Sequence, residues 1–317
     1  MLTAPRFCVR VHHAGYSYGQ LLAIWRTAER LGYDGASLYD VLSGPAVEVW
    51  TALTALTLAT RHLVGIPLVL DMSYRHPVTL AKMAAGLDLL SGGGRLILGL
   101  GYGGDRADHR AYGFPWEPMA RRVEQLGEQV RIMRSLWTEP RTTIRGAHFS
   151  LRDAPGFPTA TPGGPPILVA GRGVRHALRG VARYADLCNV SFDLSPDEWK
   201  EYRRVIAEHC VAAGRDPAEL GLTHNATVVI GRDRAEAERC LEALARSRNL
   251  TGEQARHGLA HALVGTPPEI VEQLLGYRAA GVDLAWVFLL FPDLPALNSL
   301  RLFGETVLPA YRAACRP

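Results

Sequence analysis

The chain has 317 residues, 48% of them hydrophobic, and a formal net charge of +4. This length suits one large domain, and so small a charge gives no reason to expect nucleic acid or an acidic membrane surface as a partner. The five cysteines are far apart and form no CxxC pair, which favours buried thiols in a reducing compartment.

Segments typical of strands and helices alternate from one end of the chain to the other. A short apolar run is followed by a helical spacing of apolar residues that stops at Gly32. Strands are expected at 7–11, 34–39, 62–70, 94–100, 167–170, 186–192, 220–230 and 282–291. Helices are expected at 18–31, 47–60, 77–90, 118–137, 174–184, 196–213, 235–247, 268–280 and 299–314.

This alternation predicts a single domain over residues 1–317 that folds as a (β/α)8 TIM barrel, because strands separated by helices form a parallel sheet covered by helices. Two stretches without clear periodicity, 138–165 and 249–266, are predicted to be irregular insertions. The chemistry of such barrels lies at the C-terminal ends of the strands, so polar residues there are the candidates for function.

A glycine-rich segment follows the fourth expected strand. Its Gly99-x-Gly101-x-x-Gly104 spacing matches a dinucleotide fingerprint in letters. That fingerprint requires a helix to begin at once, whereas here about a dozen irregular residues follow. Residues such as Gly101 and Gly103 instead allow a flat ring system to approach the backbone. Tyr102 and His109 follow the same strand and are candidates to line this pocket.

A second turn joins the fifth expected strand to its helix. It contains Gly171, Arg172, Gly173 and Val174, and the free N–H groups of a helix N-terminus can hold a phosphate. The competing interpretation is an ordinary strand–helix turn with solvent-exposed arginines.

Three further polar residues close the first two strands. His12 and His13 lie at the tip of the first strand, where either can protonate a substrate, and Asp40 closes the second strand, where it can contact a cofactor. The sequence has no HExxH motif, no EF-hand loop and no clustered Cys/His spacing, so no metal is expected.

The ends and the hydropathy of the chain suggest a cytoplasmic protein. No basic segment followed by a long apolar one occurs at the N-terminus. No run of about 18 apolar residues occurs, so no membrane partner is expected.

Together these motifs resemble the luciferase-like monooxygenase superfamily, which includes flavin enzymes and oxidoreductases that use the deazaflavin coenzyme F420. The matching stretches run in order through nearly the whole chain and include AERLGYDGASLYD and PPILVAGRGVRHALRG. The resemblance implies a (β/α)8 barrel, commonly dimeric, with the cofactor ring at its C-terminal mouth. It also implies a non-prolyl cis peptide at Leu68–Val69 beside the ring, contact of Asp40 with the deazaflavin, and phosphate binding by residues 171–174.

The chain also departs from the F420-linked dehydrogenases of this superfamily. Several of them carry a catalytic histidine after the matching aspartate, where this chain has Val41, and their acidic loop residue is replaced by Tyr102. The proton donor is therefore expected among His12, His13, Tyr102 and His109.

The favoured function is F420-dependent hydride transfer to or from a small organic substrate. The alternatives are an FMN-dependent monooxygenase and a cofactor-binding protein without turnover. F420 is preferred over FMN because the chain is short for the luciferase-type members. Whether the protein is a homodimer stays open.

Overall fold

A parallel barrel forms the centre of the computed structural model, which describes residues 5–171 and 176–316. The predicted (β/α)8 barrel is confirmed. Its strands are β1 (Arg6–Arg10), β2 (Gly35–Leu38), β3 (Val64–Pro67), β4 (Leu70–Asp71), β5 (Leu98–Gly101), β8 (Ile167–Ala170), β9 (Leu187–Phe192), β10 (Gly221–Ile230) and β12 (Leu284–Leu290). They are hydrogen-bonded in the order β3-β2-β1-β12-β10-β9-β8-β5-β4.

The third barrel strand is divided into β3 and β4, and these two halves connect the two ends of the sheet into a closed barrel. β3 pairs with β2, and β4 pairs with β5, so the two halves occupy the two ends of the strand order. Between them lies the Leu68–Val69 peptide bond, which is cis at the position that the resemblance implied. The sequence predicted one continuous strand over 62–70, and the interruption is the difference.

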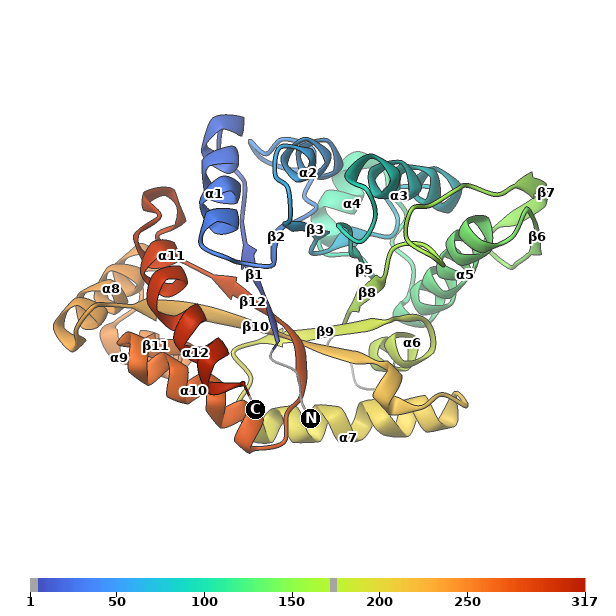
Figure 1. Cartoon of the computed structure of the whole chain (residues 1–317). Helices are drawn as coiled ribbons and strands as arrows, with labels where there is room; N and C mark the ends of the chain where they lie inside the picture. Colours follow the sequence, from blue (N-terminus) through green and yellow to red (C-terminus); the bar gives the residue numbers. More distant parts are fainter. Residues whose placement is uncertain (1–4, 172–175, 317) are drawn as a thin grey trace.

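Helices surround the barrel, as Figure 1 shows. They are α1 (Tyr18–Arg30), α2 (Val49–Leu58), α3 (Pro77–Ser91), α4 (Arg106–Tyr112), α5 (Met119–Thr138), α6 (Ala177–Tyr184), α7 (Pro196–Ala212), α8 (Arg234–Ser247), α9 (Gly252–Gly258), α10 (Pro267–Ala279), α11 (Asn298–Leu302) and α12 (Leu308–Ala314). Short helical turns occupy Pro217–Glu219, Leu294–Ala296 and Phe303–Val307. The segment that forms α4 was expected to be irregular. It is helical because Asp105 caps its first turn by accepting a hydrogen bond from the Ala107 N–H.

The two segments that were predicted to be irregular contain regular structure. Within 138–165, β6 (Arg141–Arg145) and β7 (Ser150–Pro155) form an antiparallel hairpin that projects beyond α5 at the right of Figure 1. Glu128 on α5 accepts three N–H groups from the hairpin turn, which ties the turn to the body of the protein. Within 249–266, α9 and the short strand β11 (Leu263–Gly265) form, and β11 pairs with the end of β10.

Side chains of β1 alternate between the helices and the barrel interior. Phe7 and Val9 join the large core that also contains helix residues. Cys8 belongs to a separate apolar cluster drawn mainly from strands, which fills the lower part of the interior: Cys8, Val64, Ile66, Leu68, Ile97, Leu168, Trp286 and Phe288. Arg10 lies two residues further along the same face, so the interior changes from apolar to polar toward the C-terminal end of the barrel.

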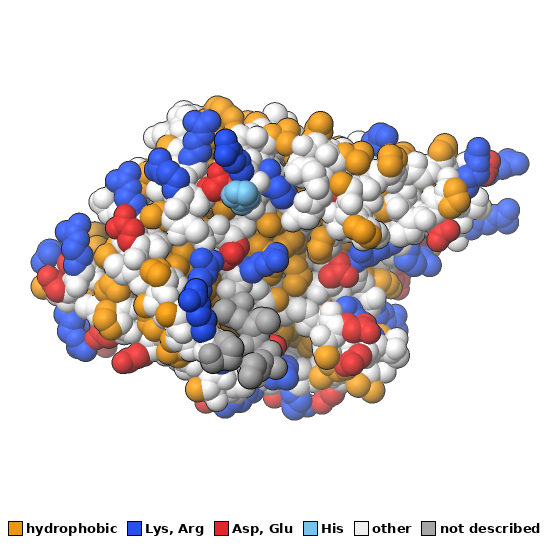
Figure 2. Space-filling view, in the orientation of Figure 1, with side chains coloured by type: hydrophobic (Ala, Val, Ile, Leu, Met, Phe, Trp, Pro, Cys, Tyr) orange, Lys and Arg blue, Asp and Glu red, His pale blue; other side chains and the backbone are white. Residues whose placement is uncertain are grey.

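On the face seen in Figure 2, basic and acidic side chains are interspersed, and charges of one sign form no continuous stripe. Among the residues that the structure describes, no helix combines the length and the apolar character needed to cross a bilayer.

A buried histidine on the helix side of β10 makes stability sensitive to acid. The Trp199 indole N–H donates to His224 Nδ1 at 3.0 Å, and burial lowers the pKa of His224 to about 3. The unfolded chain takes up a proton near pH 6.5, whereas the folded one does not until about pH 3. Stability is therefore unaffected by this group above pH 6.5 and is lost as the pH falls below that value.

We expect wild-type protein to lose about 2 kcal/mol more unfolding free energy than His224→Gln between pH 7.5 and pH 5. Glutamine keeps an acceptor for Trp199 but does not titrate. Urea denaturation at the two pH values measures the difference, and parallel losses in the two proteins would contradict the assignment.

Candidate functional site

A cleft opens at the C-terminal ends of the barrel strands, where the sequence placed the chemistry. It is lined by residues of β4, β5, β8 and β9 and of the segments next to β2, β4, β5 and β8: Asp40, Val69, Leu70, Asp71, Gly101, Tyr102, Gly103, Gly104, Ala170, Gly171 and Val190. The structure thus brings together Asp40, Val69, Gly101, Tyr102, Gly103 and Gly171, all of which the sequence had proposed as cofactor contacts.

Glycines let β5 pass close to the divided third strand. A Cβ at Gly99 would overlap the carbonyl oxygen of Pro67, and one at Gly101 would lie 2.6 Å from Val69 Cγ2. Gly103 has φ of +103°, and its Cβ would lie 3.1 Å from an Arg122 nitrogen. Any larger side chain at these positions would displace the wall of the cleft, so the glycines are needed for its shape.

Asp40 is held in a bidentate ion pair. Arg75 Nη1 donates to Asp40 Oδ2 at 2.6 Å and Arg75 Nη2 to Asp40 Oδ1 at 3.2 Å, while the same guanidinium reaches Glu48 at 2.6 Å. Burial lowers the pKa of Arg75, but the bonds to Asp40 and Glu48 outweigh this and raise it. The Asp71 N–H also donates to Asp40 Oδ2 at 3.0 Å, so the carboxylate is fixed in orientation at the rim of the cleft.

Asp71 ties the cleft to the helix behind it. Its Oδ2 accepts from the Gly104 N–H at 3.2 Å and lies 2.8 Å from His109 Nε2; its Oδ1 accepts from the Ser73 N–H at 2.9 Å. His109 Nδ1 lies 2.9 Å from the Pro115 carbonyl, which only accepts, so Nδ1 carries a hydrogen. The contact between Nε2 and Oδ2 therefore completes a hydrogen-bonded link from the cleft to α4.

His109 is fully buried and both of its ring nitrogens have partners. It lies behind the cleft, in contact with Asp71, and does not line the cleft surface. The structure thus places it as a positioning residue for Asp71 and the glycine loop, whereas the sequence proposed it as a proton donor.

Tyr102 lines the cleft with its ring, but its hydroxyl points elsewhere. The hydroxyl donates to the Ala177 carbonyl of α6 at 3.0 Å, and burial raises the pKa of the phenol. A phenol that is already donating to backbone and that resists ionisation is not placed to exchange protons with a molecule in the cleft.

The two histidines after β1 have different surroundings. His13 is buried and its Nε2 lies 2.9 Å from the Val47 carbonyl; burial lowers its pKa. His12 is accessible to solvent, and its ring packs 4.7 Å from the ring of Tyr39. The surrounding rim lowers the pKa of His12, chiefly by desolvation and then by the charge of Arg10. Of the two, His12 is the one that a molecule in the mouth can reach.

The predicted phosphate-binding turn is described only at Gly171, whose N–H donates to the Asn189 carbonyl at 2.9 Å. Gly171 lies against α6 and Tyr102, because a Cβ there would lie 2.6 Å from Ala177 Cβ. Arg172, Gly173 and Val174 lie outside the described residues.

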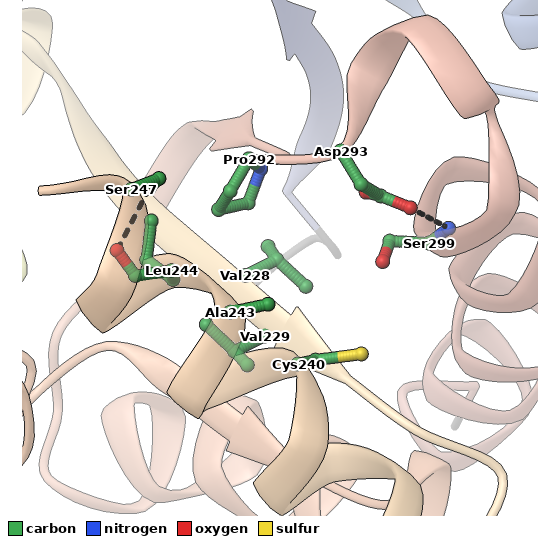
Figure 3. Close-up of a pocket in the computed structure, with 9 residues that line it drawn as sticks. All are labelled: Val228, Val229, Cys240, Ala243, Leu244, Ser247, Pro292, Asp293 and Ser299. Carbon is green, nitrogen blue, oxygen red and sulfur yellow. Dashed lines mark hydrogen bonds between the residues drawn. The ribbon is translucent and has the colours of Figure 1, made fainter. Parts of the chain in front are cut away.

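A second hollow lies outside the barrel, between β10, α8 and the segment after β12 (Figure 3). Cys240 on α8 faces Asp293 and Ser299 across it. The Ser299 N–H donates to Asp293 Oδ2 at 3.0 Å. Its walls share no residue with the glycine-lined cleft, and we assign the chemistry to the cleft.

One residue that lines the cleft, Asp71, was not proposed from the sequence as a cofactor contact, although the segment Leu70–Tyr74 was expected to lie at the catalytic end of the barrel. Asp71 ends β4, and its contacts with Gly104 and His109 depend on residues more than 30 positions away.

Comparison with known proteins gives a family match over residues 1–284, to the family described as luciferase-like monooxygenase. A phthiodiolone/phenolphthiodiolone dimycocerosates ketoreductase of Mycobacterium tuberculosis is 32% identical over 226 residues, which cover 68% of this chain and 57% of the relative. The alignment thus spans little more than half the length of that relative.

Two further similar proteins match almost end to end. An F420-dependent hydroxymycolic acid dehydrogenase of M. tuberculosis is 27% identical, with 96% of this chain and 88% of that protein covered. The solved structure of an F420-dependent secondary alcohol dehydrogenase with an F420-acetone adduct has a TM-score of 0.79 at 18% identity, covering 98% of this chain and all of that one (100%). The last of these comparisons shows the fold alone.

Proposed function

The chain belongs to the luciferase-like monooxygenase family, and we propose that it is an oxidoreductase that transfers a hydride between coenzyme F420 and a small organic substrate. The observation that carries this proposal is the glycine-lined cleft at the C-terminal ends of the barrel strands. Its support from comparison is that relatives matching nearly the whole chain are F420-dependent dehydrogenases.

The residues of the cleft suit a flat ring. Gly99 and Gly101 let β5 lie close to Pro67 and Val69, so the wall of the cleft along β5 and the third strand is compact. Asp40 and Asp71 place fixed carboxylates at one edge of this wall. On this proposal Leu68, Val69, Gly101, Tyr102 and Gly103 hold the ring.

The phosphate of the cofactor is assigned to the turn that begins at Gly171 and includes Arg172, Gly173 and Val174. This part of the proposal rests on the sequence and on the family resemblance. Arg172→Ala is expected to weaken F420 binding; an unchanged dissociation constant would remove the assignment.

When bound, the deazaflavin supplies the hydride acceptor or donor of the reaction. The protein must then move the accompanying proton and keep water away from the reacting carbon. We assign the proton transfer to His12, because its side chain is accessible to solvent after β1 and its lowered pKa leaves the imidazole neutral at pH 7. A neutral imidazole accepts the proton of a substrate hydroxyl when the alcohol is oxidised.

Binding measurements separate the candidate cofactors. We expect F420 to bind at least about tenfold more tightly than FMN, a difference of about 1.4 kcal/mol, when each is titrated into purified protein and followed by fluorescence. Tight FMN binding together with no F420 binding would favour the alternative, an FMN-dependent monooxygenase. Binding of F420 with no turnover across a broad panel of alcohols and ketones would favour the non-catalytic alternative. That alternative is considered because Val41 stands where several F420-linked dehydrogenases carry a catalytic histidine.

A substitution at the mouth tests the role of His12. We expect His12→Phe to leave F420 affinity within about twofold and to lower alcohol oxidation by roughly 100-fold or more, as loss of a general base does. In the wild type, kcat/KM for oxidation should be level above pH 6.5 and fall as His12 is protonated below it. An inflection above pH 7, or a fully active His12→Phe variant, would assign the proton transfer to another group.

A further inference from the structure

Arg10 lies on the inner face of the barrel, at its C-terminal end. Alternation along β1 places Cys8 and Arg10 on the same inner face, and Cys8 is part of the apolar interior cluster. Arg10 Nη1 donates to Asn225 Oδ1 of β10 at 3.1 Å, across the interior. The guanidinium therefore lies inside the barrel near His12, close enough for its charge to contribute to lowering the pKa of that histidine.

The neighbours of Arg10 form a chain of donors that runs away from it. Asn225 Nδ2 donates to Asn189 Oδ1 at 3.0 Å, and Asn189 Nδ2 donates to Thr223 Oγ1 at 2.8 Å. The Thr223 hydroxyl donates in turn to the Cys188 carbonyl at 3.0 Å. The side-chain acceptors of this chain are already used, and Arg10 Nε is left without an acceptor.

The positive charge of Arg10 has no carboxylate partner. Within residues 5–171 and 176–316, Arg10 takes part in no ion pair, and its Nε is buried with no hydrogen-bond acceptor. Asp193, which follows β9, is itself engaged by the N–H and hydroxyl of Thr227 at 2.6 and 2.8 Å. Burial lowers the pKa of Arg10 to about 10, as expected for a cation without a counter-charge.

An exposed aromatic ring lies beside this cation. The Arg10 guanidinium carbon is 4.2 Å from the ring centre of Phe192 at the end of β9, and Phe192 is 37% exposed. A cation short of acceptors, next to an apolar ring that is open to solvent, is the pair of features that a ligand with both an anionic and an apolar part requires.

We propose that Arg10 binds the carboxylate of the substrate, and that the substrate is therefore a small organic acid whose apolar part packs against Phe192. The proposal rests on the F420-dependent function assigned to the neighbouring cleft, since it names the substrate class of that site. A carboxylate supplies the acceptors that the guanidinium lacks, and it does so in the planar geometry that a guanidinium matches.

The test compares benzoate with benzamide, which have the same ring and differ in charge. Isothermal titration of each into the full chain, with and without F420, measures their dissociation constants. We expect the wild type to bind benzoate at least about tenfold more tightly, the range of one charge-assisted hydrogen bond. Arg10→Gln, which keeps a donor for Asn225, should lose this preference, and Arg10→Lys should keep part of it.

Arg6 provides the matched control. It lies on the same face of β1 at the opposite end of the barrel, over the ring of Trp286, and is exposed. Arg6→Gln should behave as the wild type. Thermal denaturation of each variant establishes that it is folded. Removing a buried charge that has no counter-charge should leave the Tm of Arg10→Gln near that of the wild type.

Benzoate and benzamide binding equally to the wild type, or a benzoate preference that survives in Arg10→Gln, would overturn the proposal. A fall in F420 affinity in Arg10→Gln with the preference unchanged would also overturn it and assign the guanidinium to the cofactor. A wild type that fails to bind F420, yet shows a preference for benzoate that Arg10→Gln abolishes, would support the anion site while removing the proposed cofactor.

Discussion

Gly99→Ala is expected to destabilise the protein by about 3 kcal/mol, the upper part of the range for an overpacked core, and to abolish F420 binding. The added Cβ would overlap the Pro67 carbonyl oxygen and lie 3.1 Å from Val69 Cγ1. Because the obstacle is backbone, no rotamer change can relieve it, and β5 must move away from the third strand. Urea unfolding and a fluorescence titration with F420 measure the two effects.

Two other glycines of the same loop make the result interpretable. A Cβ at Gly104 meets nothing within 4 Å, so Gly104→Ala should change stability by no more than about 0.5 kcal/mol. At Gly101 the closest atom to the Cβ is the side-chain Cγ2 of Val69, at 2.6 Å, and the nearest backbone atom is at 3.7 Å, so Gly101→Ala should fall between the two. A Gly99→Ala variant as stable as Gly104→Ala would show that the wall of the cleft yields easily.

Asp71→Asn is expected to cost about 2 kcal/mol of stability and to weaken F420 binding, because it leaves a backbone N–H at the cleft without an acceptor. Asp71 accepts hydrogen bonds from the Ser73 and Gly104 N–H groups and contacts the fully buried His109. An asparagine keeps the shape of the side chain but turns one acceptor into a donor, which must face one of these two N–H groups.

The neighbouring Asp105→Asn variant is the control for Asp71→Asn. Asp105 also accepts an N–H, from Ala107 at 2.7 Å, but it is exposed and asparagine caps helices as well as aspartate does. Its stability should stay within about 0.5 kcal/mol of the wild type. Equal, small losses in both variants would show that the hydrogen bonds of Asp71 contribute little.

The barrel followed from the sequence because each of its strands and most of its helices carry their own periodicity. The elements that the sequence missed are those whose stability comes from elsewhere. Helix α4 has seven residues and a largely polar sequence, so only its cap at Asp105 marks it. Strands β6 and β7 pair with each other alone, and their turn is held by Glu128 of α5.

The site was predicted at the level of strand ends but not of side-chain direction. Asp40, Gly101 and Gly171 lie at the cleft as the sequence proposed, because the end of a strand fixes their position. Where the Tyr102 hydroxyl points depends on the backbone of α6, and the orientation of Arg10 depends on its hydrogen bond to Asn225, 215 residues away. Such long-range pairings are not encoded in any local pattern.

The pairing of β1 with both β2 and β12 also constrains how the protein is made. The last strand, Leu284–Leu290, is the partner of the first. A nascent chain on the ribosome must therefore carry one unpaired edge of β1 until residues 284–290 have emerged, and such an edge invites association with other chains. Biogenesis of this protein should accordingly depend on chaperones that shield the N-terminal strand until closure.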